Sequence, residues 1–426
     1  MAASTADVRI RGIASGGSGV GDLPDGRVVF VPRTSPGDEV RVRIEKSKAR
    51  WAVGSLQRIL DPAPDRVEAP CALYAECGGC QIQHLSYEQQ LSAKAGFVSD
   101  ALVRIGGFEG LAPIQVIGSP REIHYRNRVT YTLRRLRGGH VIAGFHALGR
   151  PAHVLDVLDQ CLLPVEELVP VWSRIRAGWG EGARNLPDGG RIQLTLRTVA
   201  AGVELLVHGG AAAWNAVKLA AEVPELTAIW HVPAGPRALA VLVSGHSAPG
   251  GGASFEQVNA DVAALLRDYV IDQAGSGISD AQVTGRGAID AYCGIGEYGH
   301  ALAQADWSVT GIEVDPAAVE AARSKAVKGF ELRTGLVEEC LEELLPAELL
   351  IVNPPRTGLA KEVPPVIAAE APLRLIYVSC DPATLARDLG ALSDVFELQE
   401  VRAFDLFPQT AHVETVAVLT KREAGG

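Results

Sequence analysis

Cys380 lies where a reactive thiol is best placed in an α/β protein. The run Leu375-Ile376-Tyr377-Val378-Ser379 before it is typical of a buried strand, and Asp381-Pro382 after it ends that strand. In open parallel sheets, ligands and reacting groups gather at the carboxyl ends of strands. The pattern therefore indicates either a nucleophile or a buried inert cysteine, and position alone does not separate the two.

A glycine turn and an acid follow two earlier strands. Ile289 to Gly296 is predicted to be a strand running into a Gly294-Ile295-Gly296 turn, and Glu313 ends the next strand about twenty residues later. Glycines let a ligand approach the backbone, and a carboxylate at this point can bind both ribose hydroxyls of an adenosine cofactor. The third glycine of a dinucleotide fingerprint is absent because Glu297-Tyr298-Gly299 follows, which favours S-adenosylmethionine over NAD.

Two further residues join this expected site. Asn353-Pro354-Pro355 ends another strand in a turn that can hold a planar polar group against a rigid backbone. Tyr292 either flanks the cofactor or is only the last core aromatic of its strand. With Cys380, three successive strand tips are expected to face one crevice.

A set of cysteines has the spacing of metal ligands. Cys71-x5-Cys77-x2-Cys80 forms a tight cluster, and Cys161 is a candidate fourth ligand from far along the chain. By ligand type, four thiolates suit zinc or a 4Fe-4S cluster equally well. Cys293 and Cys340 are assigned to structural positions.

The chain of 426 residues predicts a multidomain α/β protein. Residues 1–60 alternate as strands of an OB-like β-barrel, and residues 61–254 form a central α+β domain that carries the cysteines. Residues 255–426 form a Rossmann-like, doubly wound domain. A helix at about 86–106 is expected to pack on that last domain.

The central domain also contains a segment dense in arginine. It is interleaved with Tyr125 and Tyr131, so cations and stacking rings could serve phosphates and unstacked bases of RNA. The candidate RNA-binding residues are Arg126, Arg128, Arg134 and Arg135. A basic surface of the barrel, which includes Arg33 and Trp51, could also face nucleic acid, and for that surface a solvated strand face is the alternative.

The net charge of −10 excludes a protein coated in positive charge but leaves room for local basic patches. No export signal or membrane-spanning stretch is recognised, and seven cysteines favour thiol or metal chemistry over disulfides. We expect a cytoplasmic monomer without membrane contact.

Beyond these patterns, the chain resembles the RNA (uracil-5-)-methyltransferases, in particular members that modify 23S ribosomal RNA and carry a TRAM domain and an iron-sulfur cluster. The resemblance spans nearly the whole chain. Its most specific segments are the four cysteines, Phe255-Glu256-Gln257-Val258-Asn259, Asp290 to Gly296, Asn353 to Gly358, Ser379 to Asp388 and His412 to Val416.

The resemblance implies a class I methyltransferase domain, a TRAM barrel at residues 1–60 and a 4Fe-4S cluster on Cys71, Cys77, Cys80 and Cys161. It also implies that Cys380 is the nucleophile and Glu414 the base. The implied S-adenosylmethionine contacts are Gln257, Tyr292, Gly294, Gly296, Glu297, Glu313 and Asn353. Some relatives have aspartate at position 353 and asparagine at position 297, which leaves those two contacts open.

The chemistry accounts for these residue types. Carbon 5 of uracil is too weak a nucleophile to attack a sulfonium methyl group unaided, and adding a thiolate to carbon 6 converts it to an enolate. A base must then remove the carbon 5 proton, for which His412 is a fallback to Glu414. Arg387 or the sulfonium is expected to stabilise the thiolate, and the target base must leave its stack.

Three alternatives remain open. A transfer RNA uridine-5 or RNA cytosine-5 methyltransferase would use the same cysteine. An amino-group methyltransferase would use Asn353 and leave Cys380 inert. A non-catalytic RNA-binding or ribosome assembly factor would retain the fold without the reaction.

Overall fold

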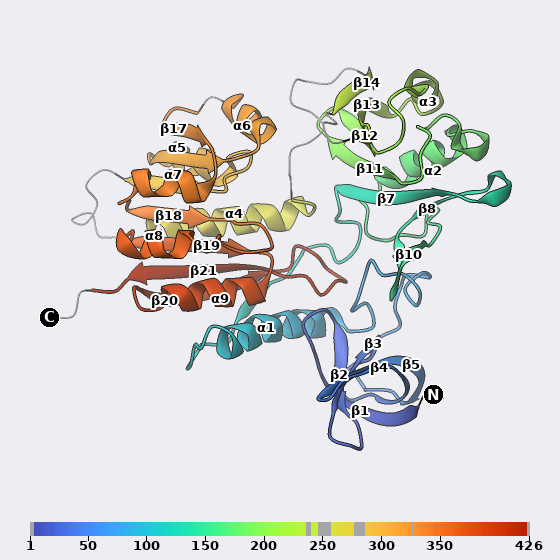
Figure 1. Cartoon of the computed structure of the whole chain (residues 1–426), viewed down its shortest axis with the longest axis horizontal. Helices are drawn as coiled ribbons and strands as arrows, with labels where there is room; N and C mark the ends of the chain where they lie inside the picture. Colours follow the sequence, from blue (N-terminus) through green and yellow to red (C-terminus); the bar gives the residue numbers. More distant parts are fainter. Residues whose placement is uncertain (1–3, 236–239, 246–256, 277–285, 326, 424–426) are drawn as a thin grey trace.

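The computed structural model describes residues 4–235, 240–245, 257–276, 286–325 and 327–423. They form an N-terminal barrel, a central sheet and a C-terminal sheet layered with helices (Figure 1). Phe255 and Glu256, which contribute to the resemblance, lie outside the described residues. The expected domain boundary at 254/255 lies there as well.

The barrel closes through five strands in the order β1-β2-β3-β5-β4. Their bounds are β1 (Thr5–Ile13), β2 (Ser18–Asp22), β3 (Val28–Pro32), β4 (Glu39–Ser47) and β5 (Trp51–Asp61). Alternate residues such as Val29, Val31, Val40 and Val42 are fully buried inside, as the period of two requires. The predicted OB-like barrel is confirmed.

The central part is a six-stranded sheet in the order β14-β13-β12-β11-β7-β8, with a separate two-stranded pair. Its strands are β7 (Arg128–Arg135), β8 (Val141–Gly144), β11 (Ile192–Val199), β12 (Gly202–His208), β13 (Leu226–Val232) and β14 (Val241–Gly245). The pair is β9 (His146–Ala147) and β10 (Arg150–Val154), and short helices are η1 (Arg137–Gly139) and η2 (Glu181–Ala183). Helices α2 (Leu168–Gly178) and α3 (Ala216–Glu222) cover one face, where Tyr131 stacks on Trp172.

The C-terminal sheet has eight strands in the order β17-β16-β15-β18-β19-β21-β20-β6. Its strands are β6 (Gln115–Ile117), β15 (Gly287–Ala291), β16 (Ser308–Glu313), β17 (Phe330–Thr334), β18 (Leu349–Val352), β19 (Arg374–Ser379), β20 (Phe396–Phe404) and β21 (Glu414–Lys421). Strands β15 to β19 are parallel and β21 is antiparallel to its neighbours. The predicted Rossmann-like fold is confirmed.

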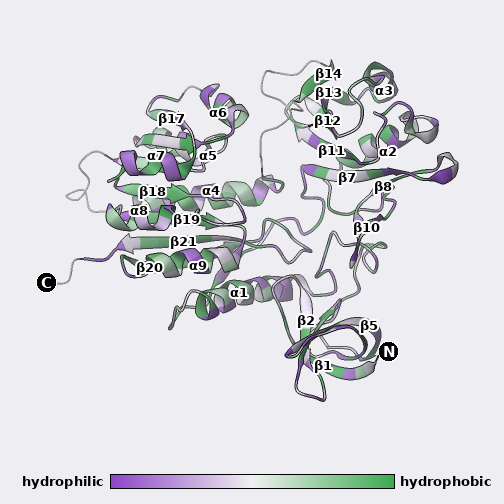
Figure 2. Ribbon diagram, in the orientation of Figure 1, coloured by the Kyte–Doolittle hydropathy of each residue, from purple (hydrophilic) through white to green (hydrophobic). Residues whose placement is uncertain are grey.

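Helices cover both faces of this sheet, so its central strands are apolar on both sides. The helices are α4 (Ala260–Gly275), α5 (Glu297–Gln304), α6 (Pro316–Arg323), α7 (Val337–Leu344), α8 (Val363–Ala369) and α9 (Pro382–Leu392). Leu375 and Tyr377 of β19 face the core under α7, α8 and α9, while Ile376 and Val378 face the core under α4 and α5. Figure 2 shows the hydrophobic strands and the hydrophilic outer end of the β7–β8 hairpin.

The segment after the cysteines lies against the C-terminal sheet. Helix α1 (Tyr87–Arg104) is capped by Ser86, whose side chain accepts the Gln89 N–H, and it buries Phe97, Val98 and Leu102. Val98 and Leu102 belong to the same core as α9. Strand β6 then pairs in parallel with β20, so the chain enters this sheet before it builds the central one.

A buried ion pair fastens α1 to the loop between β20 and β21, residues Asp405–Val413, which we call the base loop. The Lys94 ammonium pairs with Asp405, both side chains are fully buried, and Lys94 also donates to the Phe407 carbonyl at 3.0 Å. Burial lowers the pKa of Lys94, and Asp405 opposes that shift. Such a pair contributes mainly by fixing geometry, because desolvation offsets much of its attraction.

None of the helices in the described ranges is both long and apolar enough to cross a bilayer.

Lys94→Met should leave Asp405 buried without its cation and lower the free energy of unfolding by about 3–5 kcal/mol. Urea denaturation followed by far-UV circular dichroism measures the loss. Lys94→Met combined with Asp405→Leu removes both charges and should recover most of the loss. A Lys94→Met protein that is as stable as the native chain would contradict this role of the pair.

Candidate active site

Strand register brings Cys380 and Glu414 together. In the antiparallel β19–β21 pair, Val378 is opposite Val416 and Ser379 is opposite Thr415. Continuing the register by one residue places Cys380 opposite Glu414. The thiol and the carboxyl therefore meet at the carboxyl end of β19, although 33 residues separate them in the sequence.

The fold controls the ionisation of both groups. Burial raises the pKa of Glu414 to about 8, and Arg356 opposes the shift. Burial and the nearby Glu414 carboxyl raise the pKa of the Cys380 thiol, while a hydrogen bond from Arg356 lowers it. Paired groups with such shifts are typical of catalytic sites.

Arg356 was not anticipated as a partner of the thiol. Its Nη2 also lies 2.9 Å from Nδ1 of His412. Burial, followed by the charge of Arg356, lowers the pKa of His412 to about 4. The ring is therefore neutral, and its Nδ1 lone pair accepts from Arg356, which weakens His412 as an alternative base.

The expectation that Arg387 serves the thiol was wrong. Its guanidinium pairs with Asp388 at 2.7 Å and donates to the Thr357 carbonyl at 3.0 Å. Asp388 in turn accepts from Tyr377 at 2.6 Å and from the Leu359 N–H at 2.8 Å. Arg387 is an exposed residue of α9 that pairs with the buried Asp388, whereas Arg356 contacts the thiol.

The glycine turn and the acid of the next strand contact each other. Glu313 accepts the Gly294 N–H at 2.9 Å through one oxygen and the N–H groups of Val314 and Asp315 through the other. Gly294 and Gly296 have φ of +56° and +74°, which favour glycine. A Cβ on Gly296 would also lie 2.5 Å from the Phe330 ring.

Tyr292 has a φ of +61°, which is unusual for a bulky residue and costs energy. The residue lies between β15 and the glycine turn and is half-buried. Strain of this kind is concentrated at ligand sites, which supports a role beyond filling the core.

Asp290 is a feature that the sequence reasoning missed. It is fully buried in β15, it accepts the Gly299 N–H of α5 at 2.9 Å, and its other oxygen has no partner among the described residues. Burial raises its pKa to about 7. The signal for it in the sequence is its place between Ile289 and Ala291, because an acid inside an apolar strand is rare.

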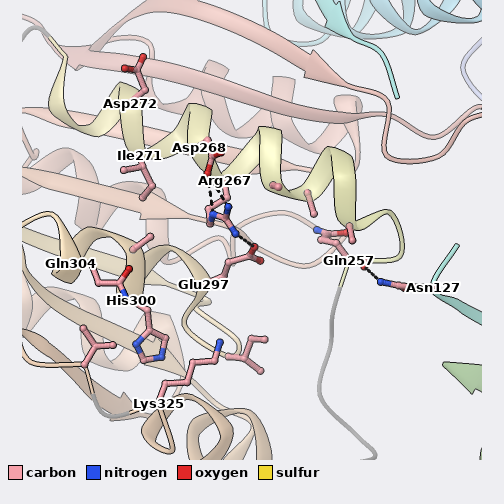
Figure 3. A pocket seen from close by; sticks show the side chains of 16 residues that line it. Asn127, Gln257, Arg267, Asp268, Ile271, Asp272, Glu297, His300, Gln304 and Lys325 are labelled. Atoms are coloured by element: carbon pink, nitrogen blue, oxygen red, sulfur yellow. Dashed lines mark hydrogen bonds and ion pairs between the residues drawn. The ribbon is translucent and has the colours of Figure 1, made fainter. Parts of the chain in front are cut away.

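Gln257 and Glu297 line a groove between α4, α5 and the residues around Lys325 (Figure 3). The Gln257 carbonyl accepts from the Asn127 side chain at 3.1 Å, and Glu297 lies 3.8 Å from Arg267. Asn353 donates its N–H to the Ala291 carbonyl at 3.2 Å, which fixes the Asn-Pro-Pro turn beside the glycine turn. These contacts do not test the expected cofactor roles of Gln257, Glu297 and Asn353, which stay predictions.

The four cysteines meet at one small, largely apolar cavity, although Cys161 lies far from the others in the sequence. The cavity is lined by Cys71, Cys77, Cys80 and Cys161 with Leu73, Tyr74, Gly79, Gln83, Phe145, Leu162 and Leu163. Burial raises the pKa of Cys80 to about 11 and that of Cys161 to about 12. Over the described ranges, no group of three or more histidine, cysteine or acidic side chains is close enough to hold a single metal ion.

Residues 71–83, which we call the cysteine loop, are held by Arg33 of the barrel. Its guanidinium donates to the carbonyls of Cys77 and Cys80, both at 2.6 Å, and lies 3.6 Å from the centre of the Tyr74 ring. Arg33 is 9% exposed. Arg33, one of the barrel cations expected to face either nucleic acid or solvent, is instead part of a domain junction.

The candidate RNA-binding arginines differ in their surroundings. Arg135 donates to the carbonyls of Gly182, Ala183 and Leu186, so its guanidinium already supports the central fold. Arg134 is near the surface and donates only weakly to Gly190, at 3.3 Å. Arg126 lies near the Tyr125 and Phe407 rings, and Arg128 begins β7.

Two family models match parts of the chain. The TRAM domain family matches residues 1–56, and the family described as tRNA (Uracil-5-)-methyltransferase matches residues 336–422. The second match contains Cys380, Glu414 and Arg356.

Relatives and solved structures extend the likeness over the chain. An uncharacterized RNA methyltransferase of Thermosynechococcus vestitus is 33% identical over 98% of both chains, and one of Halalkalibacterium halodurans is 32% identical over 97% of this chain and 96% of its own. The crystal structure of Pyrococcus abyssi tRNA (uracil-54, C5)-methyltransferase with S-adenosyl-L-homocysteine superposes with a TM-score of 0.74. It covers 97% of this chain and 99% of its own at 24% identity, which supports the fold. With relatives this similar over nearly the full length, the chain belongs to the RNA (uracil-5-)-methyltransferase family.

Proposed function

We propose that the protein transfers the methyl group of S-adenosylmethionine to carbon 5 of a uridine in RNA. The observation that carries this proposal is the pairing of Cys380, which follows β19, with Glu414, which begins β21. A thiol and a base with a raised pKa, held opposite each other, are what addition to carbon 6 and proton removal at carbon 5 require.

The cofactor is proposed to lie across the tips of β15, β16 and β18. The Gly294 turn would admit it close to the backbone, and Glu313 would accept the ribose hydroxyls. When bound, S-adenosylmethionine supplies an electrophilic methyl group. Its positive charge would also favour the ionised forms of Cys380 and Glu414.

The reaction then follows from the residues of this chain. The Cys380 thiol loses its proton to solvent, Arg356 stabilises the thiolate, and the sulfur adds to carbon 6. Carbon 5, now part of an enolate, takes the methyl group as the methyl–sulfonium bond breaks, and its electron pair stays on the sulfur of S-adenosylhomocysteine. Glu414 removes the carbon 5 proton, the carbon–sulfur bond breaks, and Cys380 leaves with the electron pair of that bond.

Cys71, Cys77, Cys80 and Cys161 are proposed to hold a 4Fe-4S cluster. The support is the convergence of four thiols on one enclosed apolar cavity, whose walls would exclude solvent from a cluster. The buried thiols have raised pKa values, so they would become thiolates only against a positive metal centre. None of the proposed chemical steps uses an electron from the cluster.

The substrate is proposed to be 23S ribosomal RNA, on the strength of the TRAM barrel together with the cysteine set. Transfer RNA is the second candidate, because the Pyrococcus abyssi relative is named for it. Undermodified total RNA incubated with the protein and labelled S-adenosylmethionine, followed by nucleoside analysis of each RNA class, tests both. Label in 5-methylcytidine, or no label, would contradict the proposal.

Cys380→Ala should abolish methylation and also the covalent complex with RNA containing 5-fluorouridine, whose carbon 5 has no removable proton. A shifted band on a denaturing gel detects that complex in the native protein. Cys340→Ala, a change in a cysteine away from the site, should leave the band intact. A complex that persists in Cys380→Ala would contradict the assignment of the nucleophile.

Release of tritium from uridine labelled at carbon 5 should increase as the pH rises towards about 8, because Glu414, whose pKa is raised by burial, must be ionised to accept the proton. Glu414→Gln should release no tritium and instead accumulate the methylated covalent adduct. The raised pKa also means that stability falls as pH rises from the usual carboxyl range through about 8. Tritium release that is independent of pH between about 6 and 9 would contradict this role.

Cys77→Ser should lose iron and acid-labile sulfide after anaerobic purification, with Cys340→Ser retaining both in equal measure to the native chain. Inductively coupled plasma analysis measures the iron, and visible absorbance reports the cluster. Equal iron in both variants would contradict the cluster assignment.

A further inference from the structure

The cysteine loop and the base loop contact each other directly. The backbone N–H groups of Gln81 and Ile82 both donate to the Gln409 carbonyl, at 3.1 and 3.2 Å. Gln81 follows Cys80 by one residue, and Gln409 precedes Glu414 by five. Few residues therefore separate this contact from Cys80 on one side and from Glu414, the proposed base, on the other.

The Gln81 side chain joins the same two loops. Its Nε2 donates to the Gly78 carbonyl at 2.8 Å, and its Oε1 accepts the Ala411 N–H at 3.3 Å. The first bond lies within the Cys77–Cys80 turn, and the second reaches the residue before His412. One amide group thus spans both loops, with each of its ends hydrogen-bonded.

The base loop requires such support because its backbone is strained. Gln409 is only 4% exposed and has a φ of +69°. Its backbone N–H donates to Gln90 at 2.9 Å, and its side chain accepts from Gln90 at 3.0 Å. A strained residue persists when its surroundings determine its conformation from several sides, here α1 and the cysteine loop.

Close packing leaves little room for this contact to shift. Gly17 of the barrel has a φ of +82°, and a Cβ there would lie 2.7 Å from the Gln81 Cβ and 3.2 Å from the Ala411 Cβ. Tyr74 also donates to the Gln81 carbonyl at 2.7 Å. The barrel therefore packs closely against both the cysteine loop and the base loop at the point where they meet.

We infer that Gln81 is a positioning residue, through which the cysteine loop holds the base loop so that Glu414 faces the carbon 5 proton. The inference rests on the proposed function and extends it. It gives the cysteine centre a mechanical role in the last step of the reaction, proton removal, and none in the attack by Cys380.

Gln81→Met tests this inference, because methionine keeps the volume of the side chain and removes both hydrogen bonds. We expect Gln81→Met to keep the iron content of the native protein and its ability to form the 5-fluorouridine complex. Its kcat should fall roughly tenfold or more, with little change in KM. Covalent adduct with ordinary uridine in undermodified total RNA should accumulate. Gln81→Glu keeps an acceptor for the Ala411 N–H and should retain more of the native kcat.

Hydrogen–deuterium exchange gives a readout that is independent of catalysis. The peptide covering Gln409–Glu414 should exchange faster in Gln81→Met and at the native rate in the control Gln399→Met. The Gln399 side chain donates to the Thr420 hydroxyl at 2.8 Å, away from the base loop. The inference would be overturned if Gln81→Met kept both the native exchange rate and the native kcat. It would also be overturned if the variant changed only KM, or if its lower activity came with a loss of iron. Absence of any 5-fluorouridine complex in the native protein would instead refute the proposed function. The exchange comparison would still test whether Gln81 holds the base loop.

Discussion

The arrangement of the molecule depends on one short segment, the cysteine loop, which contacts all three parts of the chain. Arg33 of the barrel binds its carbonyls, the Gly78 N–H donates to His146 of the central part at 3.0 Å, and Gln81 reaches the base loop. Gly78 has to be glycine at this point because a Cβ would lie 2.9 Å from the His146 carbonyl. The loop contains little regular secondary structure, so its shape is set by these contacts and by its four-cysteine cavity.

This dependence would give the proposed 4Fe-4S cluster a structural purpose in the proposed reaction, which transfers no electrons to or from a cluster. Loops have few internal hydrogen bonds, and one that joins domains gains rigidity when several of its side chains are tied to a single point. The base loop is held from the other side by α1, through Gln90 and the buried Lys94–Asp405 pair. The proposed base is thus positioned by two separate elements, neither of which belongs to its own strand.

The electrostatics of the site follow from the same burial. Glu414 lies at the start of a strand that is apolar on both sides, and desolvation keeps its carboxyl largely protonated at neutral pH. Cys380 is shifted in the same direction, and Arg356 is the cation that opposes both shifts. In the proposed reaction, the positive cofactor would favour the ionised, reactive forms of both groups.

The sequence alone was sufficient for the features that local chemistry encodes. Alternation predicted the barrel, apolar runs predicted β15, β16, β18 and β19, and the position of Cys380 before Asp381-Pro382 predicted a thiol at a strand tip. Cysteine spacing pointed to one shared centre, and Cys161 lines that cavity with the other three. These patterns depend on neighbours within a few residues, so they can be read without a fold.

Only the tertiary structure decided which partners those residues have. Arg356 and Arg387 are equivalent cations in the sequence, yet the turn after β18 brings one to the thiol, while α9 directs the other to Asp388. Arg33 is one basic residue among many in the barrel until its carbonyl partners are known, and Gln81 has no distinguishing feature in the sequence. Hydrogen bonds and pKa shifts depend on distance and burial between segments far apart in the chain, and that information exists only after the segments have packed.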